Sequence, residues 1–312
     1  NRFHWHLTDD RWRFEIKKYP ELTRVGAKGN TSNPDAPCAF YTQEEIREVV
    51  SYAAERHIMV IPEIEMPGHA RGATISYPKL AGGDDSDPNW KWFTYNPASP
   101  AVFEFLDDVL GETIALFPGP YLHIGGDEPQ FGWKAWTKRP EVKALMAKDK
   151  FTTLGQVDVH FMDRMARVVA KKGKKVMGWE EVAKTGLRPD QVAPIWWHDE
   201  DQKGLADKIG KGYEAIVCPH YPMYFDFIQS KDHKSGRLHL LNTTEAVYGY
   251  PEPLRKNVPD IDKAAGLQAA AWSERIHTPE RLWFMICPRL AALAEAAWTQ
   301  ADRKDYSDFR AR

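Results

Sequence analysis

The chain has 312 residues, of which 43% are hydrophobic and 28% charged, and its formal net charge at pH 7 is -2. This is an ordinary globular composition, and a chain of this length can bury a substantial core. The near-neutral charge argues against a nucleic acid partner, and no stretch approaches the roughly 20 apolar residues that a membrane span requires.

The ends of the chain and its cysteines carry little information. Cys38, Cys218 and Cys287 are few and odd in number, so they predict neither a disulfide framework nor a zinc knuckle, and we expect them to be buried apolar residues. The first residues lack the basic segment and apolar run of a signal peptide. They already form a strand pattern without an initiator Met, so we expect that an upstream segment has been removed. The compartment and the oligomeric state stay open.

Short apolar runs alternate with helical patterns along the chain. Strands are expected, in order, at residues 2–8, 58–64, 120–124, 175–179, 192–196, 214–218 and 267–272. Helices are expected from Thr42, from Ser99-Pro100, over 153–171 and 201–209, and from Thr278-Pro279 to about residue 298. This alternation, without an internal repeat or a low-complexity linker, predicts a wound α/β architecture in one domain over residues 1–312.

Polar and aromatic side chains gather just past the carboxyl ends of the predicted strands. They are Asp9, Asp10, Glu63, Glu65, His69, Asp127, Glu128, Trp179, Glu180, Trp196, Tyr224, Asp226, Trp272 and Glu274. This is the layout of the active face of a (β/α)8 barrel of the TIM type. Only seven strands are visible, so the first strand of such a barrel is expected to be missing and the chain to start at the second.

Two adjacent carboxylates, Asp127 and Glu128, follow a Gly-Gly turn at the end of a short apolar strand. Two carboxyl groups this close resist simultaneous ionisation, and a protein can use that conflict to obtain one acid and one anion. For an isolated Asp-Glu pair, a solvated loop with a capping Asp is the commoner explanation. The argument for an acid site therefore depends on the rest of the chain.

Five motifs, in matching order and spacing, resemble the catalytic barrel of the family-20 glycoside hydrolases, the β-N-acetylhexosaminidases. They lie at residues 3–10, 62–69, 123–128, 272–274 and 288–295, and the resemblance spans nearly the whole chain. It implies an exo-acting, retaining enzyme that removes terminal β-linked N-acetylglucosamine or N-acetylgalactosamine. It also implies no cofactor and no metal. In this family the substrate's own acetamide attacks and forms an oxazolinium intermediate, an exception to the usual two-carboxylate mechanism.

The residues agree with that mechanism. Neighbouring carboxylates on one loop approach a sugar from one side, so a nucleophile on the opposite face has to come from elsewhere. The resemblance implies that Glu128 is the general acid and then the general base, and that Asp127 holds the acetamide N–H and stabilises the cationic intermediate. It also implies that Tyr224 donates a hydrogen bond to the acetamide carbonyl.

Aromatic residues are plentiful, with 12 Trp in the chain, and flat apolar rings suit the apolar faces of sugars as well as a protein core. The resemblance implies that Trp179, Trp196 and Trp272 wall the pocket of the acetamido group. Trp197 adjoins Trp196, and strand alternation turns only one of the two toward that pocket. We select Trp196.

Further carboxylates are expected to hold the sugar. Asp226 and Glu274 would accept hydrogen bonds from its outer hydroxyl groups. Asp9 and His69 are expected instead to form a relay that reaches Glu128. The roles of Asp10, Glu63 and Glu65 stay undecided between structure and function.

Two features depart from the family pattern. The family's pocket contains an Arg at the end of the first barrel strand, and no residue here can take that role. Between residues 230 and 257 the family often adds a Trp, whereas this chain offers Tyr248 and Tyr250. We therefore expect the rim of the pocket to differ.

Three other functions compete with this one. A metal-dependent hydrolase could use His4, His6, His69, His123 and His220 together with Asp127. A conventional two-carboxylate retaining glycosidase could use Glu274 or Glu180 as its nucleophile. A barrel that binds N-acetylhexosamine without catalysis is the third.

Overall fold

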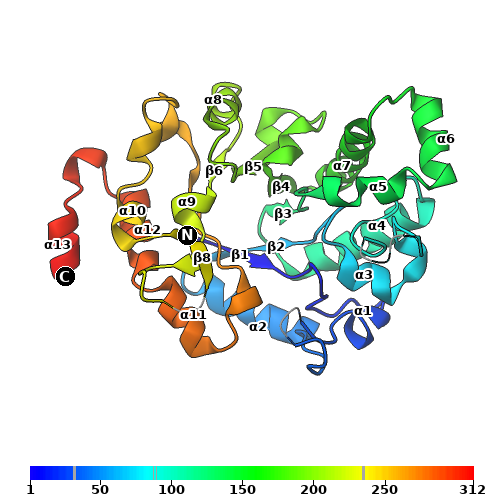
Figure 1. Ribbon diagram of the computed structural model, residues 1–312, viewed down its shortest axis with the longest axis horizontal. Coiled ribbons are helices and arrows are strands. Elements are labelled where there is room, and N and C mark those ends of the chain that lie inside the picture. The colour runs from blue at the N-terminus through cyan, green and yellow to red at the C-terminus, as the bar shows by residue number, and fades with distance from the viewer. Residues whose placement is uncertain (31–32, 87, 89, 234–235) are drawn as a thin grey trace. The chain divides into compact units, whose positions relative to one another are not determined.

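The computed structural model describes residues 1–30, 33–86, 88, 90–233 and 236–312 (Figure 1). Contacts divide the chain into two compact units, Asn1–Val192 and Ala193–Arg312. The single domain over residues 1–312 stays a prediction.

The first unit is built on a parallel sheet with the strand order β1-β2-β3-β4. The strands are β1 (Arg2–His6), β2 (Met59–Glu63), β3 (Tyr121–His123) and β4 (Lys175–Trp179). The α-helices are α1 (Glu21–Arg24), α2 (Gln43–Ala54), α3 (Arg71–Ser76), α4 (Pro100–Leu116), α5 (Trp133–Trp136), α6 (Pro140–Asp149) and α7 (Leu154–Lys171). Short 3-10 helices are η1 (Pro78–Leu80), η2 (Pro129–Gly132), η3 (Glu180–Lys184) and η4 (Pro189–Gln191).

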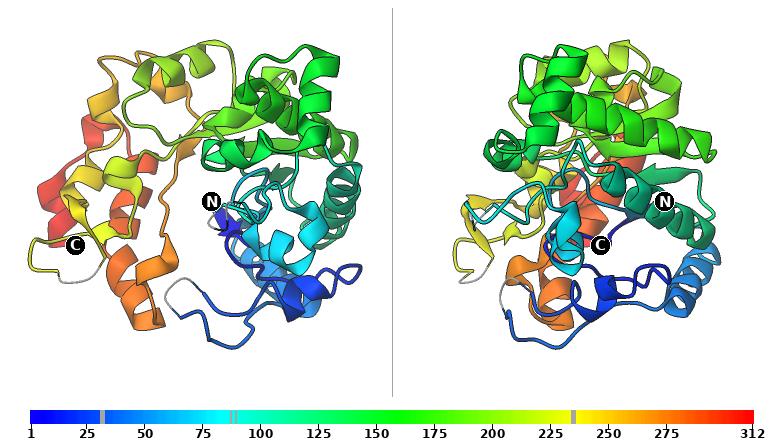
Figure 2. Two further views of the ribbon diagram at one scale, coloured as in Figure 1. Left: turned by 45° about the vertical axis from the view of Figure 1, so that its right-hand side comes forward. Right: turned by 90° about the vertical axis from the view of Figure 1, so that its right-hand side faces the viewer.

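Local sequence signals explain the major helices of this unit. Thr42 and Glu45 form the predicted capping box at the start of α2, and Thr153 and Gln156 form another at the start of α7. The helices α4 and α7 lie side by side (Figure 2), where the rings of Phe103 and Phe161 are 5.2 Å apart. The buried apolar face of α4 packs against α7, and α7 in turn packs against β4.

The second unit has a parallel sheet with the order β5-β6-β9 and a separate two-stranded sheet, β7-β8. The strands are β5 (Val192–Trp196), β6 (Ile216–Val217), β7 (Phe227–Ile228), β8 (Arg237–Leu241) and β9 (Gly266–Leu267). The α-helices are α8 (Gln202–Gly210), α9 (His220–Met223), α10 (Thr244–Tyr248), α11 (Pro279–Ile286), α12 (Arg289–Trp298) and α13 (Tyr306–Ala311). The 3-10 helices are η5 (Glu252–Leu254), η6 (Ile261–Lys263), η7 (Ser273–Arg275) and η8 (Ala301–Arg303).

Strands are present at all seven predicted places, but the last, Gly266–Leu267, shares only Leu267 with the predicted range 267–272. The expectations differ from the structure in three further respects. The last predicted helix is two helices, because Pro288 between α11 and α12 lacks the amide N–H that a continuous helix requires. The β7-β8 sheet was not predicted, since β7 has only two residues and carries no periodicity. Cys38 and Cys287 are exposed, and only Cys218 is buried.

Arg289 at the start of α12 fixes the segment around β7. Its guanidinium is fully buried and donates hydrogen bonds to the carbonyl oxygens of Phe225, Phe227 and Asn242, at 2.6, 3.1 and 3.1 Å. A buried cation requires such acceptors, and two of the three come from the residues on either side of Asp226. Arg289 therefore holds in place the loop that carries one of the predicted sugar-binding residues.

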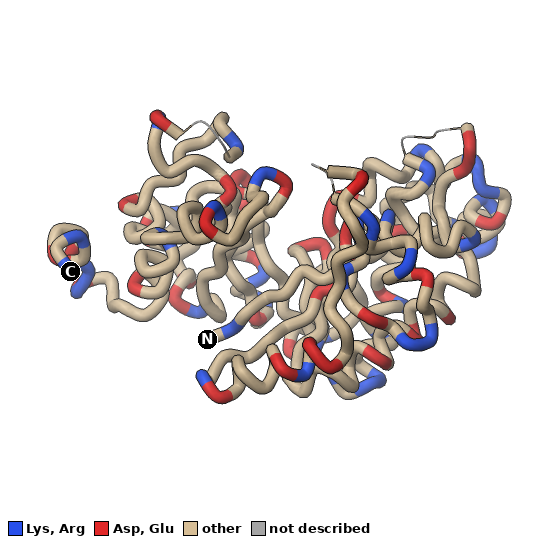
Figure 3. Tube along the Cα trace, turned by 90° about the horizontal axis from the view of Figure 1, so that it is seen from below, with Lys and Arg blue, Asp and Glu red and all other residues tan. Residues whose placement is uncertain are grey.

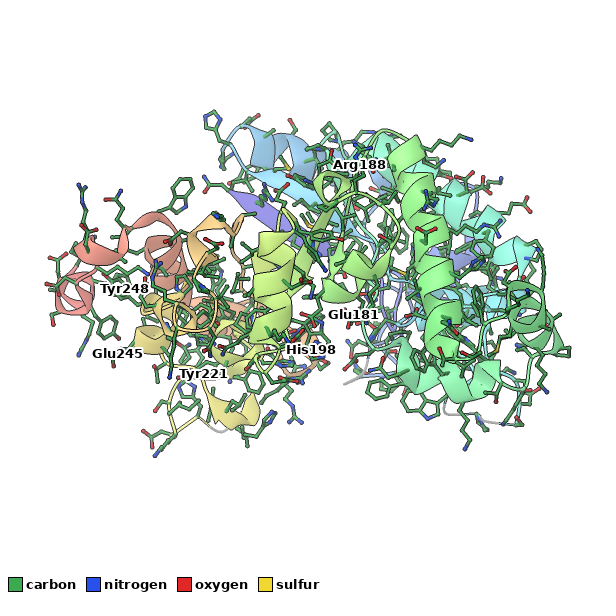
Figure 4. All side chains as sticks on the ribbon, turned by 90° about the horizontal axis from the view of Figure 1, so that it is seen from above. Glu181, Arg188, His198, Tyr221, Glu245 and Tyr248 are labelled. Carbon is green, nitrogen blue, oxygen red and sulfur yellow. The ribbon has the colours of Figure 1, made fainter. Side chains whose placement is uncertain are left out.

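Tyr248, which the sequence suggested for the rim of the pocket, instead belongs to the packing of the C-terminal segment (Figure 4). Its hydroxyl oxygen accepts a hydrogen bond from the backbone N–H of Asp305 at 2.8 Å, and its ring lies 5.0 Å from that of Phe309. Charges of both signs are interspersed along the chain (Figure 3). Within the described residues, no helix combines the length and the apolar character needed to cross a membrane.

Candidate active site

The loop that follows β3 carries the two adjacent carboxylates and has an unusual backbone. Gly125 and Gly126 have φ angles of +63° and +108°, a backbone conformation that residues with a side chain rarely adopt. A Cβ atom on Gly125 would lie 2.1 Å from Oε2 of Glu65, so this carboxyl group occupies the space that a side chain would need. The Gly-Gly turn is thus required by both the backbone conformation and the packing.

Gly125→Ala is expected to destabilise the fold, because the backbone conformation alone costs about 1 to 3 kcal/mol and the clash with Glu65 adds to this cost. Gly173→Ala is a matched control, since Gly173 also has a positive φ, +80°, but nothing lies within 4 Å of its Cβ position. Chemical denaturation of both variants measures the difference in the free energy of unfolding. Equal losses would contradict a steric role for Glu65.

His69 brings the predicted relay together. Its Nδ1 lies 3.0 Å from Oδ1 of Asp9, while its Nε2 lies 3.4 Å from Oδ2 of Asp127 and 3.3 Å from Oε2 of Glu128. Both His69 and Glu128 have left-handed backbone conformations, with φ of +48° and +54°. Such strain in residues other than Gly is often found at functional sites, where the surrounding structure enforces it.

The electrostatics of this group favour a positively charged imidazole between carboxylates. Burial alone would lower the pKa of His69, but the charge of Asp127 and the contacts to Asp9 and Glu128 raise it well above its ordinary value. Burial would raise the pKa of Asp9, yet the hydrogen bond and charge of His69 lower it. Burial raises the pKa of Asp127 to about 6, and the charge of His69 opposes this rise.

A buried polar network lies at the carboxyl ends of β1, β2 and β3. The carboxylate of Glu63 lies 2.9 Å from His4 Nε2 and 2.8 Å from His123 Nδ1, and it accepts a hydrogen bond from the indole N–H of Trp179 at 3.0 Å. Glu63 therefore fixes the orientation of Trp179, which was predicted to wall the pocket. This contact favours a positioning role for Glu63, whose role the sequence left undecided.

The two buried glutamates of this network differ in charge. Burial would raise the pKa of Glu63, but the neighbouring imidazoles, His123 first, hold it well below its usual range. Burial, with the charges of Asp127 and Glu63, raises the pKa of Glu65 well above its usual value. His6 Nε2 lies 3.0 Å from Oε1 of Glu65 and 3.4 Å from Oε2 of Glu63. A neutral Glu65 can thus sit beneath Gly125 without adding charge next to Asp127.

Histidines and carboxylates come close enough to suggest metal ligands at three places in the described residues. They are His4-Glu63-His123, His6-Glu63-Glu65 and His69-Asp127-Glu128. In each group the histidine contacts its carboxylate at hydrogen-bond or ion-pair distance, between 2.8 and 3.4 Å. These contacts account for the observed geometry by themselves, so none of the groups requires a metal to explain it.

The sequence analysis missed Glu181, a further acidic residue near the loop that follows β3; Figure 4 labels it. Glu181 lies in η3, directly after Trp179 and Glu180. A Cβ atom placed on Gly126 would lie 3.9 Å from the Cβ of Glu181. Burial raises its pKa to about 7, and the charge of Asp127 contributes. Its position after β4 was the available signal, but only Glu180 was noted there.

The second unit places several of the predicted aromatic residues in contact. The ring of Tyr224 lies 5.8 Å from that of Trp272 and 4.6 Å from that of His220, and His220 in turn lies 5.0 Å from the ring of Trp197. Trp196 is fully buried, and its indole N–H donates to the backbone oxygen of Asp201 at 3.0 Å. Trp197, and not the selected Trp196, therefore belongs to the aromatic group of Tyr224.

A cavity of about 450 Å³ in the second unit contains the two predicted sugar-binding carboxylates. Its lining is Asp226, Gly236, Arg237, Leu238, His239, Trp272, Glu274 and Arg275. Nε of Arg237 lies 2.7 Å from Oδ2 of Asp226, and Nη2 of Arg237 lies 3.2 Å from Oε1 of Glu274. Burial raises the pKa of Asp226 to about 6, and the charge of Arg237 opposes this rise.

Arg237 was not predicted. The only signal was that its segment, residues 230–257, departs from the family pattern. The sequence offered Tyr248 and Tyr250 in that segment, whereas Arg237, Leu238 and His239 line the cavity.

Comparisons with known proteins identify the family of the chain. The family model described as glycosyl hydrolase family 20, catalytic domain, matches residues 1–301. The chain is 40% identical to a beta-hexosaminidase of Porphyromonas gingivalis, over 99% of this chain and 40% of that protein. It is 33% identical to a beta-N-acetylhexosaminidase of Cellulomonas fimi, over 100% of this chain and 60% of that protein. The chain thus spans about half the length of the curated relatives that it matches.

Solved structures of the family share its fold. An exo β-N-acetylglucosaminidase of Vibrio harveyi in complex with N-acetylglucosamine has a TM-score of 0.86 at 34% identity, over 99% of this chain and 51% of that one. A β-N-acetylhexosaminidase of Bacteroides fragilis has a TM-score of 0.84 at 31% identity, over 100% of this chain and 62% of that one. The predicted (β/α) barrel fold and the suspected family are confirmed, and the chain belongs to glycosyl hydrolase family 20.

Proposed function

We propose that this chain carries the catalytic residues of an exo-acting, retaining β-N-acetylhexosaminidase. The observation that carries the proposal is the contact of His69 with Asp9 on one side and with Asp127 and Glu128 on the other. The names of its relatives and the N-acetylglucosamine bound to the Vibrio harveyi enzyme support a terminal N-acetylhexosamine as the substrate.

The reaction would proceed in two steps. First, the acetamide carbonyl oxygen of the substrate attacks the anomeric carbon, the glycosidic C–O bond breaks, and Glu128 gives its proton to the leaving oxygen. Then water attacks the anomeric carbon of the oxazolinium intermediate, Glu128 takes up the proton of this water, and the acetamide is restored. Glu128 starts and ends the cycle protonated, so one residue serves both steps.

Asp127 would act through its negative charge. Its carboxylate would accept the acetamide N–H and stabilise the positive charge that develops on the cyclised group, in a site where burial strengthens the interaction. Tyr224 would donate a hydrogen bond from its hydroxyl group to the acetamide carbonyl. Within the second unit we assign the acetamide wall to Trp272 and Trp197, with Trp197 taking the place of Trp196 because of its ring contact with His220. Trp179 stays a predicted wall residue.

The proposed role of Asp127 makes the reaction sensitive to pH. The pKa of Asp127, raised by burial, is about 6, so its carboxylate takes up a proton and loses its charge as the pH falls through this value. We expect kcat/KM to fall about tenfold per pH unit below about pH 6, with an apparent pKa near this value, because kcat/KM reports the ionisation of the free enzyme. The pH profile of kcat/KM measures this. A constant kcat/KM between pH 7 and pH 4.5 would contradict an anionic role for Asp127.

Hydrolysis of an aryl β-N-acetylglucosaminide and the matching galactosaminide, each with and without a thiazoline mimic of the cyclised acetamide, tests the proposed function. Turnover that the thiazoline inhibits strongly is the expected result. Turnover without inhibition would favour a conventional two-carboxylate glycosidase, and sugar binding without turnover would favour a non-catalytic barrel. Activity that survives exhaustive chelation would exclude the metal-dependent alternative.

A further inference from the structure

Arg237 joins the two carboxylates that were expected to hold the sugar. Its guanidinium makes ion pairs with Asp226 and Glu274 inside the cavity of the second unit. Its backbone N–H also donates to the backbone oxygen of Asp226 at 2.9 Å, because β8 begins at Arg237 beside β7. The side chain is therefore held at a defined position relative to Asp226.

Arg237 and Asp226 keep hydrogen-bonding groups that their ion pair does not satisfy. A guanidinium has five N–H groups, and the two ion pairs of Arg237 engage only Nε and Nη2. The side chain of Asp226 is 2% exposed, yet neither of its carboxylate oxygens has a hydrogen-bond partner of good geometry among the described residues. The carboxylate of Asp226 is therefore paired with Arg237 only by an ion-pair contact, and a ligand that donates a well-aligned hydrogen bond to it would stabilise it further.

The charges of the lining favour a neutral ligand. Asp226 and Glu274 are acidic, Arg237 and Arg275 are basic, and the formal charges of these four residues cancel. A hydroxyl group can donate to a carboxylate and at the same time accept from a guanidinium, so alternating acceptors and donors match adjacent hydroxyl groups on one edge of a sugar ring. An anionic ligand would meet two carboxylates and gain little.

We infer that Arg237 is a specificity-determining residue, whose guanidinium N–H groups donate to oxygen atoms of the outer hydroxyl groups of the substrate while Asp226 and Glu274 accept protons from these hydroxyls. The substrate class rests on the proposed function. The inference itself rests on the cavity, the two ion pairs and the unsatisfied carboxylate of Asp226.

Arg237→Met tests this inference, and Arg255→Met is the matched control. Arg255 also bridges two carboxylates, Glu252 and Asp262, but it is not among the residues that line the cavity. Loss of charge-assisted hydrogen bonds at Arg237 is expected to raise KM for the aryl β-N-acetylglucosaminide about 10- to 100-fold with little change in kcat. The Arg255→Met variant is expected to change KM less than about threefold.

Deoxygenated substrates separate hydroxyl recognition from a structural role. The 4-deoxy and 6-deoxy analogues should lose more kcat/KM in the wild type than in Arg237→Met, by at least about tenfold for one of them. If removal of each hydroxyl group lowers kcat/KM by the same factor in the wild type and in Arg237→Met, Arg237 only supports the fold and the inference is wrong. A clear preference of the wild type for a 6-sulfated substrate would overturn the neutral-ligand assignment. Arg237→Lys keeps the positive charge but lacks the planar set of guanidinium N–H donors. It allows the same comparison if the Met variant does not fold.

Calorimetric binding of free N-acetylglucosamine and of its deoxy analogues keeps the two proposals distinguishable. Binding that depends on Arg237 and on an outer hydroxyl, in a protein without turnover, would refute the proposed hydrolase and support the inference. Turnover with no coupling between Arg237 and either hydroxyl would support the hydrolase and refute the inference.

Discussion

Glu128→Gln is expected to lower kcat for an aryl β-N-acetylglucosaminide by about 10²- to 10⁴-fold, the usual range for the loss of a general acid and base. The amide cannot give a proton to the leaving oxygen or take one from water, but it keeps the size of the side chain. KM is therefore expected to change little. The effect on kcat should grow as the leaving group becomes more basic, because a poor leaving group depends more on protonation.

Glu180→Gln is the matched control for this variant. Glu180 follows β4 in η3, and a conventional mechanism could use it as the nucleophile. We expect it to retain activity within about threefold of the wild type. A loss in Glu180→Gln as large as that in Glu128→Gln, or near-normal hydrolysis by Glu128→Gln, would contradict the proposed assignment.

Asp127→Asn is expected to lower kcat by about 10²- to 10³-fold, comparable with the loss of one group that stabilises charge in a transition state. The neutral amide cannot balance the positive charge of the oxazolinium, and it can present an N–H where the carboxylate would accept one. The thiazoline mimic should therefore bind this variant at least about tenfold more weakly. The acidic limb of the pH profile near pH 6 should disappear with the carboxyl group that causes it.

Asp158→Asn is a suitable control for the removal of a buried acid. Burial raises the pKa of Asp158 on α7 to about 7, and the residue contacts neither His69 nor Glu128 among the described ion pairs. This variant is expected to keep both the kcat and the pH profile of the wild type. If the acidic limb persists in Asp127→Asn, another group titrates and the assignment of that limb to Asp127 is wrong.

Local features of the chain could be interpreted without a structure. The capping box at Thr42, the apolar runs of the strands and the adjacent Asp127 and Glu128 are patterns within a few residues, so composition and periodicity are enough to recognise them. The contact of His69 with Asp9 was expected because both follow the carboxyl ends of neighbouring parallel strands, which meet at one edge of the sheet.

Other features depend on distances that no local pattern contains. Glu63 and Glu65 look alike in the sequence. Glu63 nevertheless accepts a hydrogen bond from the indole N–H of Trp179, 116 residues further along the chain, whereas Glu65 occupies the space that a Cβ on Gly125 would need. Trp196 and Trp197 could not be separated by alternation, because it does not say which side of a strand meets Tyr224.

The order of residues along the chain was therefore sufficient for the family, the strands and the pair Asp127-Glu128, since these depend on neighbours in the sequence. The position of Arg237 in the cavity could not be predicted from the sequence, because nothing in its irregular segment distinguishes it from a surface Arg. It reaches Asp226 only because β8 pairs with β7. Packing and long-range ion pairs form between residues distant in sequence, and their energies depend on burial that only the folded structure defines.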